Sequence, residues 1–201
     1  MSLYGPLWDC QGLSIKNATD VVNNMVQKMV ALTGLSGAGK STLAANASAR
    51  LGYQVISINS IVSTLAARRG FRQRTPYVIY NVATNGLTGH NESVLSEVLK
   101  EAARATSPVI VDSIYDFRLA MQIAERIGRE NLTIISMDTG LMERVRRRNG
   151  RIISFKFLKD VPKFLSGVGL VMSHADFSIS RGSPEEAFSE LESILAAQAR
   201  R

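Results

Sequence analysis

Residues 29–43 read MVALTGLSGAGKSTL, and this stretch decides the fold. The apolar run at 29–32 has the length and the flanks of a short buried strand. The residues from 41 onward, STLAANASARLG, predict a helix that Gly52 ends. Between the two, the pattern G-x-x-x-x-G-K-[ST] is filled by Gly34, Gly39, Lys40 and Ser41. We therefore predict a strand, a glycine-rich loop and a helix in direct succession.

Each residue type in this loop suits the binding of phosphate. Gly34, Gly37 and Gly39 can adopt backbone angles that are closed to other residues, so consecutive N–H groups can turn inward as a nest for anions. Lys40, expected to face solvent, brings a mobile charge to the outer phosphates, and Ser41 offers a hard oxygen to Mg²⁺. A glycine-rich turn without a ligand is the alternative, and the flanking strand and helix argue against it. The predicted phosphate contacts are Gly34, Ser36, Gly37, Ala38, Gly39, Lys40, Ser41 and Thr42.

Length and composition indicate one α/β domain with an insertion, since the chain has 201 residues, 45% hydrophobic and 20% charged. The single cysteine, Cys10, excludes an internal disulfide and suits a reducing compartment. No apolar run approaches the length of a membrane span, and no secretion signal is recognisable. We therefore expect a cytoplasmic protein that does not associate with membranes.

The net charge of +7 and a sequence pI near 9.9 indicate polyanionic partners. Nucleotides are the minimum, and DNA or RNA is a further class. The positive charge is concentrated in two clusters, which are Arg68, Arg69, Arg72 and Arg74, and Arg144, Arg146, Arg147, Arg148 and Arg151.

A second buried strand is predicted at 53–58, followed by Asn59 and Ser60. In doubly wound sheets, ligands collect beyond the carboxyl ends of the strands, so these two residues are placed to meet a second substrate. The alternative is that they only cap the helix expected at 61–69.

The segment at about 60–105 predicts an insertion on the acceptor side. Its residues 71–90 mix aromatic and basic types, and Arg74 is the candidate substrate contact among them. Solvated helices that cover the edge of the sheet are the alternative interpretation. Helical periodicity resumes at 92–105.

An apolar strand at 108–112 ends in a carboxylate, which is the Walker B arrangement. Placed beside the phosphate loop, Asp112 is predicted to hold a Mg²⁺-bound water or to accept a substrate proton. Tyr115 and Asp116 follow as candidate substrate contacts. Asp116 also suits the N-cap of a helix predicted at 117–127.

A further strand is predicted at 132–137, and an arginine-studded helix at 141–148. We interpret about 141–165 as a lid that brings charge to a transferring phosphoryl group and excludes water. The alternatives are a solvated basic face and a surface that follows a nucleic-acid backbone.

The C-terminal part predicts a last strand at 175–179 and a helix that runs to about 199. Ser183 suits the N-cap, Pro184 the first helical position, and Glu186 completes a capping box. Residues 1–27 form an N-terminal extension, and 28–199 form the domain.

Four stretches together resemble the P-loop nucleoside and nucleotide kinases, and among these dephospho-CoA kinase and its archaeal adenylate-kinase-like relatives. They are GLSGAGKST at 34–42, VIVDSI at 109–114, ERVRRRNGR at 143–151 and ADFSISRGSPEE at 175–186. The resemblance covers about 28–199. It implies a three-layer α/β/α fold with a helical lid and a five-stranded parallel sheet in the order 2-3-1-4-5.

The chemistry implied by this resemblance is transfer of the γ-phosphoryl group of ATP, with Mg²⁺, to a hydroxyl or phosphate of a nucleotide-like small molecule. Lys40 would contact the β- and γ-phosphates, and Ser41 with Asp112 would hold Mg²⁺. The other implied contacts are Arg144 stacking near the adenine, Arg148 reaching the phosphates from the lid, and Arg181 with Gly182 lining the base pocket.

Two departures from the resemblance fall on the acceptor side. Relatives commonly carry an Asp where this sequence has Ser60, and often Gly-Ile-Arg where it has Ser113-Ile114-Tyr115. Asp112 is therefore the best remaining general base for a hydroxyl acceptor. Two other functions stay open: a kinase acting on nucleic acid, at a modified base or a strand end, and a nucleotide-binding switch without phosphotransfer.

Overall fold

The computed structural model describes residues 28–68, 70, 91–140, 143–144, 160, 167–180 and 182–199. The predicted extension at 1–27 lies outside these residues, as does the 71–90 segment. The strands are β1 (Met29–Thr33), β2 (Gln54–Ser57), β3 (Val109–Asp112), β4 (Leu132–Met137) and β5 (Phe177–Ile179). The helices are α2 (Lys40–Leu51), α3 (Ile58–Arg68), α5 (Asn91–Arg104), α6 (Phe117–Ile127), the 3-10 turn η2 (Arg129–Asn131), α9 (Val168–Ser173) and α10 (Pro184–Ala199).

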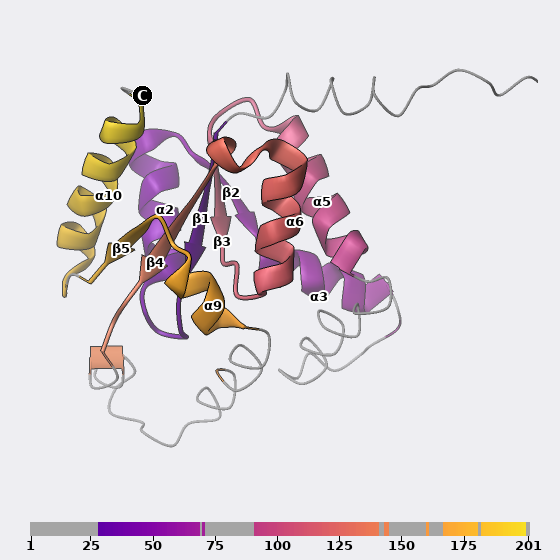
Figure 1. Cartoon of the computed structure of the whole chain (residues 1–201), viewed down its shortest axis with the longest axis horizontal. Helices are drawn as coiled ribbons and strands as arrows, with labels where there is room; N and C mark the ends of the chain where they lie inside the picture. The colour runs from indigo at the N-terminus through magenta and orange to yellow at the C-terminus, as the bar shows by residue number, and fades with distance from the viewer. Residues whose placement is uncertain are drawn as a thin grey trace, which may run out of the picture.

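All five strands are parallel and lie in the order β2-β3-β1-β4-β5, which confirms the predicted 2-3-1-4-5 sheet (Figure 1). β1 lies at the centre, and all five of its residues are buried between β3 and β4. A strand with helices on both faces has no polar side to expose, which explains the uninterrupted apolar run at 29–32.

Helices cover both faces of the sheet, with α2 and α10 on one side and α3, α5, α6 and α9 on the other (Figure 1). Successive strand residues point to opposite faces. Val30 and Leu32 accordingly pack in the core on the α2 side, and Met29 and Ala31 in the core on the other side. Asp112 pairs in register with Leu32, so its side chain lies on the α2 face of the sheet.

The bounds of β3, β4, α6 and α10 agree with those predicted to within one residue. β2, however, ends at Ser57, and α3 begins at Ile58 rather than at residue 61. The Ser57 hydroxyl accepts a hydrogen bond from the Ser60 N–H at 3.3 Å, so the chain turns into the helix earlier than its apolar run indicates.

β5 begins two residues later than predicted, because Asp176 is not a strand residue and its side chain binds β4 and the residues just before it. Its carboxylate accepts the Ile134 N–H at 2.8 Å and pairs with Arg129 at 2.6 Å. These contacts hold the start of β5 against the amino-terminal half of β4. They lie toward the amino ends of the strands, whereas the loop that follows β1 lies at the carboxyl ends.

Two predicted helix ends are confirmed. Gly52 caps α2 in the left-handed conformation, at φ 72°. At α10, the Glu186 N–H donates to the Ser183 hydroxyl at 3.2 Å and the Ser183 N–H to the Glu186 carboxylate at 3.3 Å, which is the capping box. No helix within the described ranges combines the length and the apolar character needed to cross a membrane.

Candidate functional site

The loop between β1 and α2 is built around glycines with positive φ. Gly34, Gly37 and Gly39 have φ of 130°, 84° and 100°, a region in which other residues are strained. A Cβ at Gly34 would also lie 2.6 Å from the Met137 carbonyl oxygen. Only glycine therefore allows the loop to turn this close to the end of β4.

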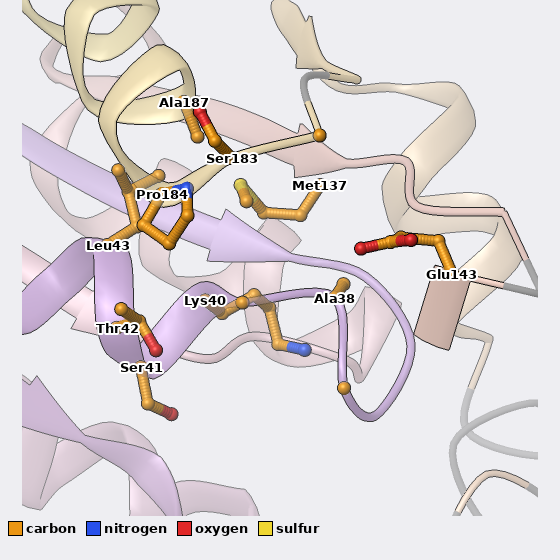
Figure 2. A pocket seen from close by; sticks show the side chains of 13 residues that line it. Ala38, Lys40, Ser41, Thr42, Leu43, Met137, Glu143, Ser183, Pro184 and Ala187 are labelled. Atoms are coloured by element: carbon orange, nitrogen blue, oxygen red, sulfur yellow. The ribbon is translucent and has the colours of Figure 1, made fainter. Parts of the chain in front are cut away.

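The loop leads into a cavity of about 750 Å³ at the N-terminus of α2. Residues 37–43 of the predicted phosphate-binding stretch line one wall. The Lys40 side chain extends into the curve of the loop, as Figure 2 shows, and donates to the Leu35 carbonyl at 2.8 Å. Contrary to the expectation that it faces solvent, Lys40 is only 6% exposed.

The far wall of the cavity is mainly apolar. It comes from the end of β4 and the start of α10, through Met137, Gly182, Ser183, Pro184 and Ala187, and the Glu143 carboxylate also lines the cavity (Figure 2). An anion-binding loop at one end and an apolar wall at the other match the two ends of a nucleotide. Gly182 was predicted to line the base pocket, and it lies on this wall.

Asp112 lies at the carboxyl end of β3, beside β1, and faces α2. It is 7% exposed, and its Oδ1 is buried with no hydrogen-bond partner among the described residues. A buried carboxylate oxygen without a donor is costly, so the position suits a ligand that supplies one.

These residues fit a magnesium ion held together with a nucleotide. The described residues contain no group of three His, Cys, Asp or Glu side chains that would form an all-protein metal cage. Mg²⁺ does not require such a cage, because it keeps several waters and takes one or two carboxylates together with substrate phosphates. Asp112 and the exposed Ser41 hydroxyl at the start of α2 match that donor set.

Arg144 occupies a position that the sequence analysis does not anticipate. Instead of lying against the apolar wall, its guanidinium pairs with Asp160 at 3.0 Å, with side-chain exposures of only 8% and 4%. Arg144 Nη1 also donates to the Ser36 carbonyl at 3.3 Å, and Asp160 accepts the Ser36 N–H at 2.9 Å. Asp160 was missed, because a lone carboxylate carries no motif.

Asn59 and Ser60 lie in the first turn of α3, where both are exposed. With Ser63, Thr64 and Ala67 they line a hollow of about 410 Å³. Since Ser57 supplies the cap of α3, the capping role considered for these two residues is wrong. They remain candidates for contact with an acceptor beyond the carboxyl end of β2.

The two candidates that follow β3 have structural roles. Tyr115 is 7% exposed and belongs to the core, and burial, followed by the neighbouring Asp116 charge, raises its pKa to about 12. Such burial does not suit a substrate contact. Asp116 caps α6, accepting the N–H groups of Arg118 at 2.9 Å and Leu119 at 3.2 Å.

We expect Asp116→Ala to lower the free energy of unfolding by about 1 kcal/mol, and Asp116→Asn to retain the cap. Burial raises the pKa of Asp116, against the opposing effect of its two backbone hydrogen bonds. A raised folded-state pKa means that its contribution to stability is lost as pH rises through that pKa. Urea denaturation at pH 4 and pH 7 should therefore show that the free energy of unfolding of Asp116→Asn, relative to that of the wild type, is higher at pH 7 than at pH 4. Equal stability of the alanine and asparagine variants would contradict the capping role.

Arg74, Arg148 and Arg181, which were also predicted to contact substrate or nucleotide, lie outside the described residues. The described residues thus bring together the phosphate loop, Asp112, Arg144 and Gly182 at one edge of the sheet.

Several solved structures share this fold at low sequence identity. TT1252 from Thermus thermophilus superposes with a TM-score of 0.60 at 16% identity, over 85% of this chain and 97% of that one. A shikimate kinase from Aquifex aeolicus gives 0.53 at 19% identity, over 85% and 98%. A sugar kinase from Janibacter sp. HTCC2649 gives 0.56 at 17% identity, over 85% and 95%.

At the level of sequence, no curated protein matches this chain. A family model described as "AAA domain" matches residues 29–152, more than half of the chain. The match begins with β1 and includes the phosphate loop, Asp112 and Arg144. The chain therefore belongs to the AAA domain family.

Proposed function

We propose that this protein is a P-loop kinase that transfers the γ-phosphoryl group of ATP, with Mg²⁺, to a hydroxyl or phosphate of a nucleotide-like small molecule. One observation carries the proposal: the cavity at the start of α2 is lined by the glycine-rich loop and the first residues of α2 on one side and by a mainly apolar wall on the other. The buried, unpartnered oxygen of Asp112 lies on the same face of the sheet. The P-loop kinases among the structures of the same fold are consistent with this function.

Each described side chain then has a separate task. The N–H groups of the loop bind the β- and γ-phosphates, and the Lys40 ammonium offsets the charge that develops on the departing ADP oxygen. Ser41 and Asp112 would hold Mg²⁺, which would supply positive charge to neutralise the phosphates and orient the γ-phosphoryl group.

In the transfer step, the acceptor oxygen forms a bond to the γ-phosphorus while the bond from that phosphorus to the bridging oxygen breaks. ADP leaves with the electron pair. When the acceptor is a hydroxyl, its proton goes to solvent, or to Asp112 where that carboxylate does not hold the metal ion, since Asp112 lies at the carboxyl end of β3 beside β1.

The two alternative functions make different demands on the site. A kinase that acts on nucleic acid relies on the basic and aromatic residues of 71–80 and 145–151, which lie outside the described residues. A switch without phosphotransfer needs the nucleotide pocket and no acceptor. The pocket alone supports both, and the polar hollow at Asn59 and Ser60 offers either kind of kinase, though not the switch, a place for an acceptor.

The test is transfer of a labelled γ-phosphoryl group from ATP to a panel of nucleosides, nucleotides, dephospho-CoA, shikimate, simple sugars and modified DNA. A labelled small-molecule product supports the proposal. If DNA is labelled instead, and the affinity of the protein for DNA falls steeply as salt rises, the protein is a nucleic-acid kinase and the proposal is replaced. Slow ATP hydrolysis that no acceptor stimulates replaces it by the switch. Calorimetry that shows no binding of Mg-ATP or any other common triphosphate removes all three.

A further inference from the structure

The carbonyl groups of the phosphate loop are held by side chains, two of which come from about a hundred residues further along the chain. These contacts use loop carbonyls and not the N–H groups of Gly37 and Gly39, two glycines that line the cavity. The three bonds are Lys40 Nζ to the Leu35 carbonyl at 2.8 Å, Arg144 Nη1 to the Ser36 carbonyl at 3.3 Å, and Thr139 Oγ1 to the Ala38 carbonyl at 3.2 Å.

Holding a carbonyl fixes the N–H group on the other side of the same peptide bond. In a trans peptide the C=O and the following N–H point in opposite directions, and the loop peptides are trans. Arg144, by binding the Ser36 carbonyl, thus orients the N–H of Gly37, and Thr139, by binding the Ala38 carbonyl, orients the N–H of Gly39. Both glycines line the cavity.

Asp160 keeps Arg144 in place and also binds the backbone of Ser36. Its Oδ2 pairs with the guanidinium at 3.0 Å, and its Oδ1 accepts the Ser36 N–H at 2.9 Å. Both charges are almost wholly buried, and a buried guanidinium that loses its counter-charge is strongly unfavourable. The two members of the ion pair therefore fix both backbone groups of Ser36: Asp160 accepts its N–H, and Arg144 donates to its C=O.

We propose that Thr139 and the Arg144–Asp160 pair are positioning residues that set the affinity of the loop for polyphosphate. They do so by orienting the N–H groups of Gly39 and Gly37 before the ligand arrives, which spares the loop the cost of ordering on binding. This inference rests on the proposed function, because it requires a polyphosphate in the cavity.

Thr139→Val tests the inference with little disturbance, because valine keeps the shape of threonine and removes only the hydroxyl. We expect the Kd of Mg-ATP and the Kd of magnesium tripolyphosphate, both from calorimetry well below the unfolding temperature, to rise by the same factor of about five to ten. Thr139→Ser keeps the hydroxyl and should bind both ligands within about twofold of the wild type. Equal loss for a ligand with a base and one without places the effect at the phosphates.

A second variant addresses the ion pair. Asp160→Asn keeps the shape and an acceptor for the Ser36 N–H while removing the charge, and we expect it to weaken both ligands by about tenfold or more. Thr139→Val that binds both ligands as tightly as the wild type, or serine and valine variants that weaken them equally, would overturn the inference and leave the proposed function standing. Wild-type protein that binds neither ligand would instead overturn the proposed function.

Discussion

Replacing Lys40 by alanine is expected to lower the rate of γ-phosphoryl transfer from ATP by roughly a hundred- to a thousandfold. The Lys40 side chain begins α2 and extends into the curve of the phosphate loop (Figure 2), where it holds the Leu35 carbonyl at 2.8 Å. The substitution removes the positive charge best placed to stabilise the transition state and also frees that carbonyl. The rate is measured with labelled ATP and whichever acceptor the panel identifies.

Two further variants separate chemistry from folding. Lys40 is 6% exposed, so alanine leaves a void, whereas Lys40→Met keeps most of the buried stem and should lose activity to the same degree. Lys100→Ala is the matched control, because Lys100 lies exposed on α5 and pairs with Glu97 at 3.1 Å in a surface ion pair of little consequence. Near-normal transfer in both Lys40 variants would refute the assignment of the ATP site.

The central strand and the loop after it were predictable from sequence because their signals are local, whereas the order of the strands in the sheet came from the resemblance. A central parallel strand must be apolar throughout, as 29–32 is, and the turn after it requires residues that tolerate positive φ, as Gly34, Gly37 and Gly39 do. The end of α2 at Gly52 and the capping box of α10 likewise depend on residues that are close in sequence.

The partners of the loop could not be predicted in this way. Asp160 binds Ser36 across 124 positions of sequence, and no periodicity or motif relates the two. The same holds for Thr139 and Ala38, which are 101 positions apart. Such contacts depend on how the segment after β4 returns to the loop, which is a property of the fold. For the same reason, the contact of Arg144 with the loop backbone was not anticipated, and its stacking near the adenine, which the resemblance implies, stays a prediction.

On the acceptor side, the same residues are compatible with two different local structures or roles. The stretch at 53–58 predicts a strand as far as Ile58, and the Ser57 hydroxyl ends it earlier by capping α3. Similarly, Asp116 follows the strand that ends at Asp112, where a substrate contact and a helix cap look alike in sequence. The two hydrogen bonds from the start of α6 identify the cap.

Asp112→Asn is expected to lower phosphoryl transfer by about a hundredfold or more, while the fold is retained. The side chain is 7% exposed at the carboxyl end of β3, and its Oδ1 has no partner in the described part of the chain. Asparagine keeps the volume, and its amide neither accepts a proton nor binds Mg²⁺ as a carboxylate does. Asp138→Asn is the control, because Asp138 is an exposed carboxylate just after β4, at the same edge of the sheet, and should be dispensable.

The form of the defect decides between the two roles considered for Asp112. If its carboxylate holds the metal ion or a metal-bound water, the variant will need more Mg²⁺ for half-maximal rate, and excess Mg²⁺ will restore part of the activity. If it accepts the acceptor proton, the Mg²⁺ dependence will stay unchanged, and no excess of Mg²⁺ will restore the activity. Full activity of Asp112→Asn at every Mg²⁺ concentration and pH would remove Asp112 from the mechanism and leave the unpartnered oxygen without a catalytic explanation.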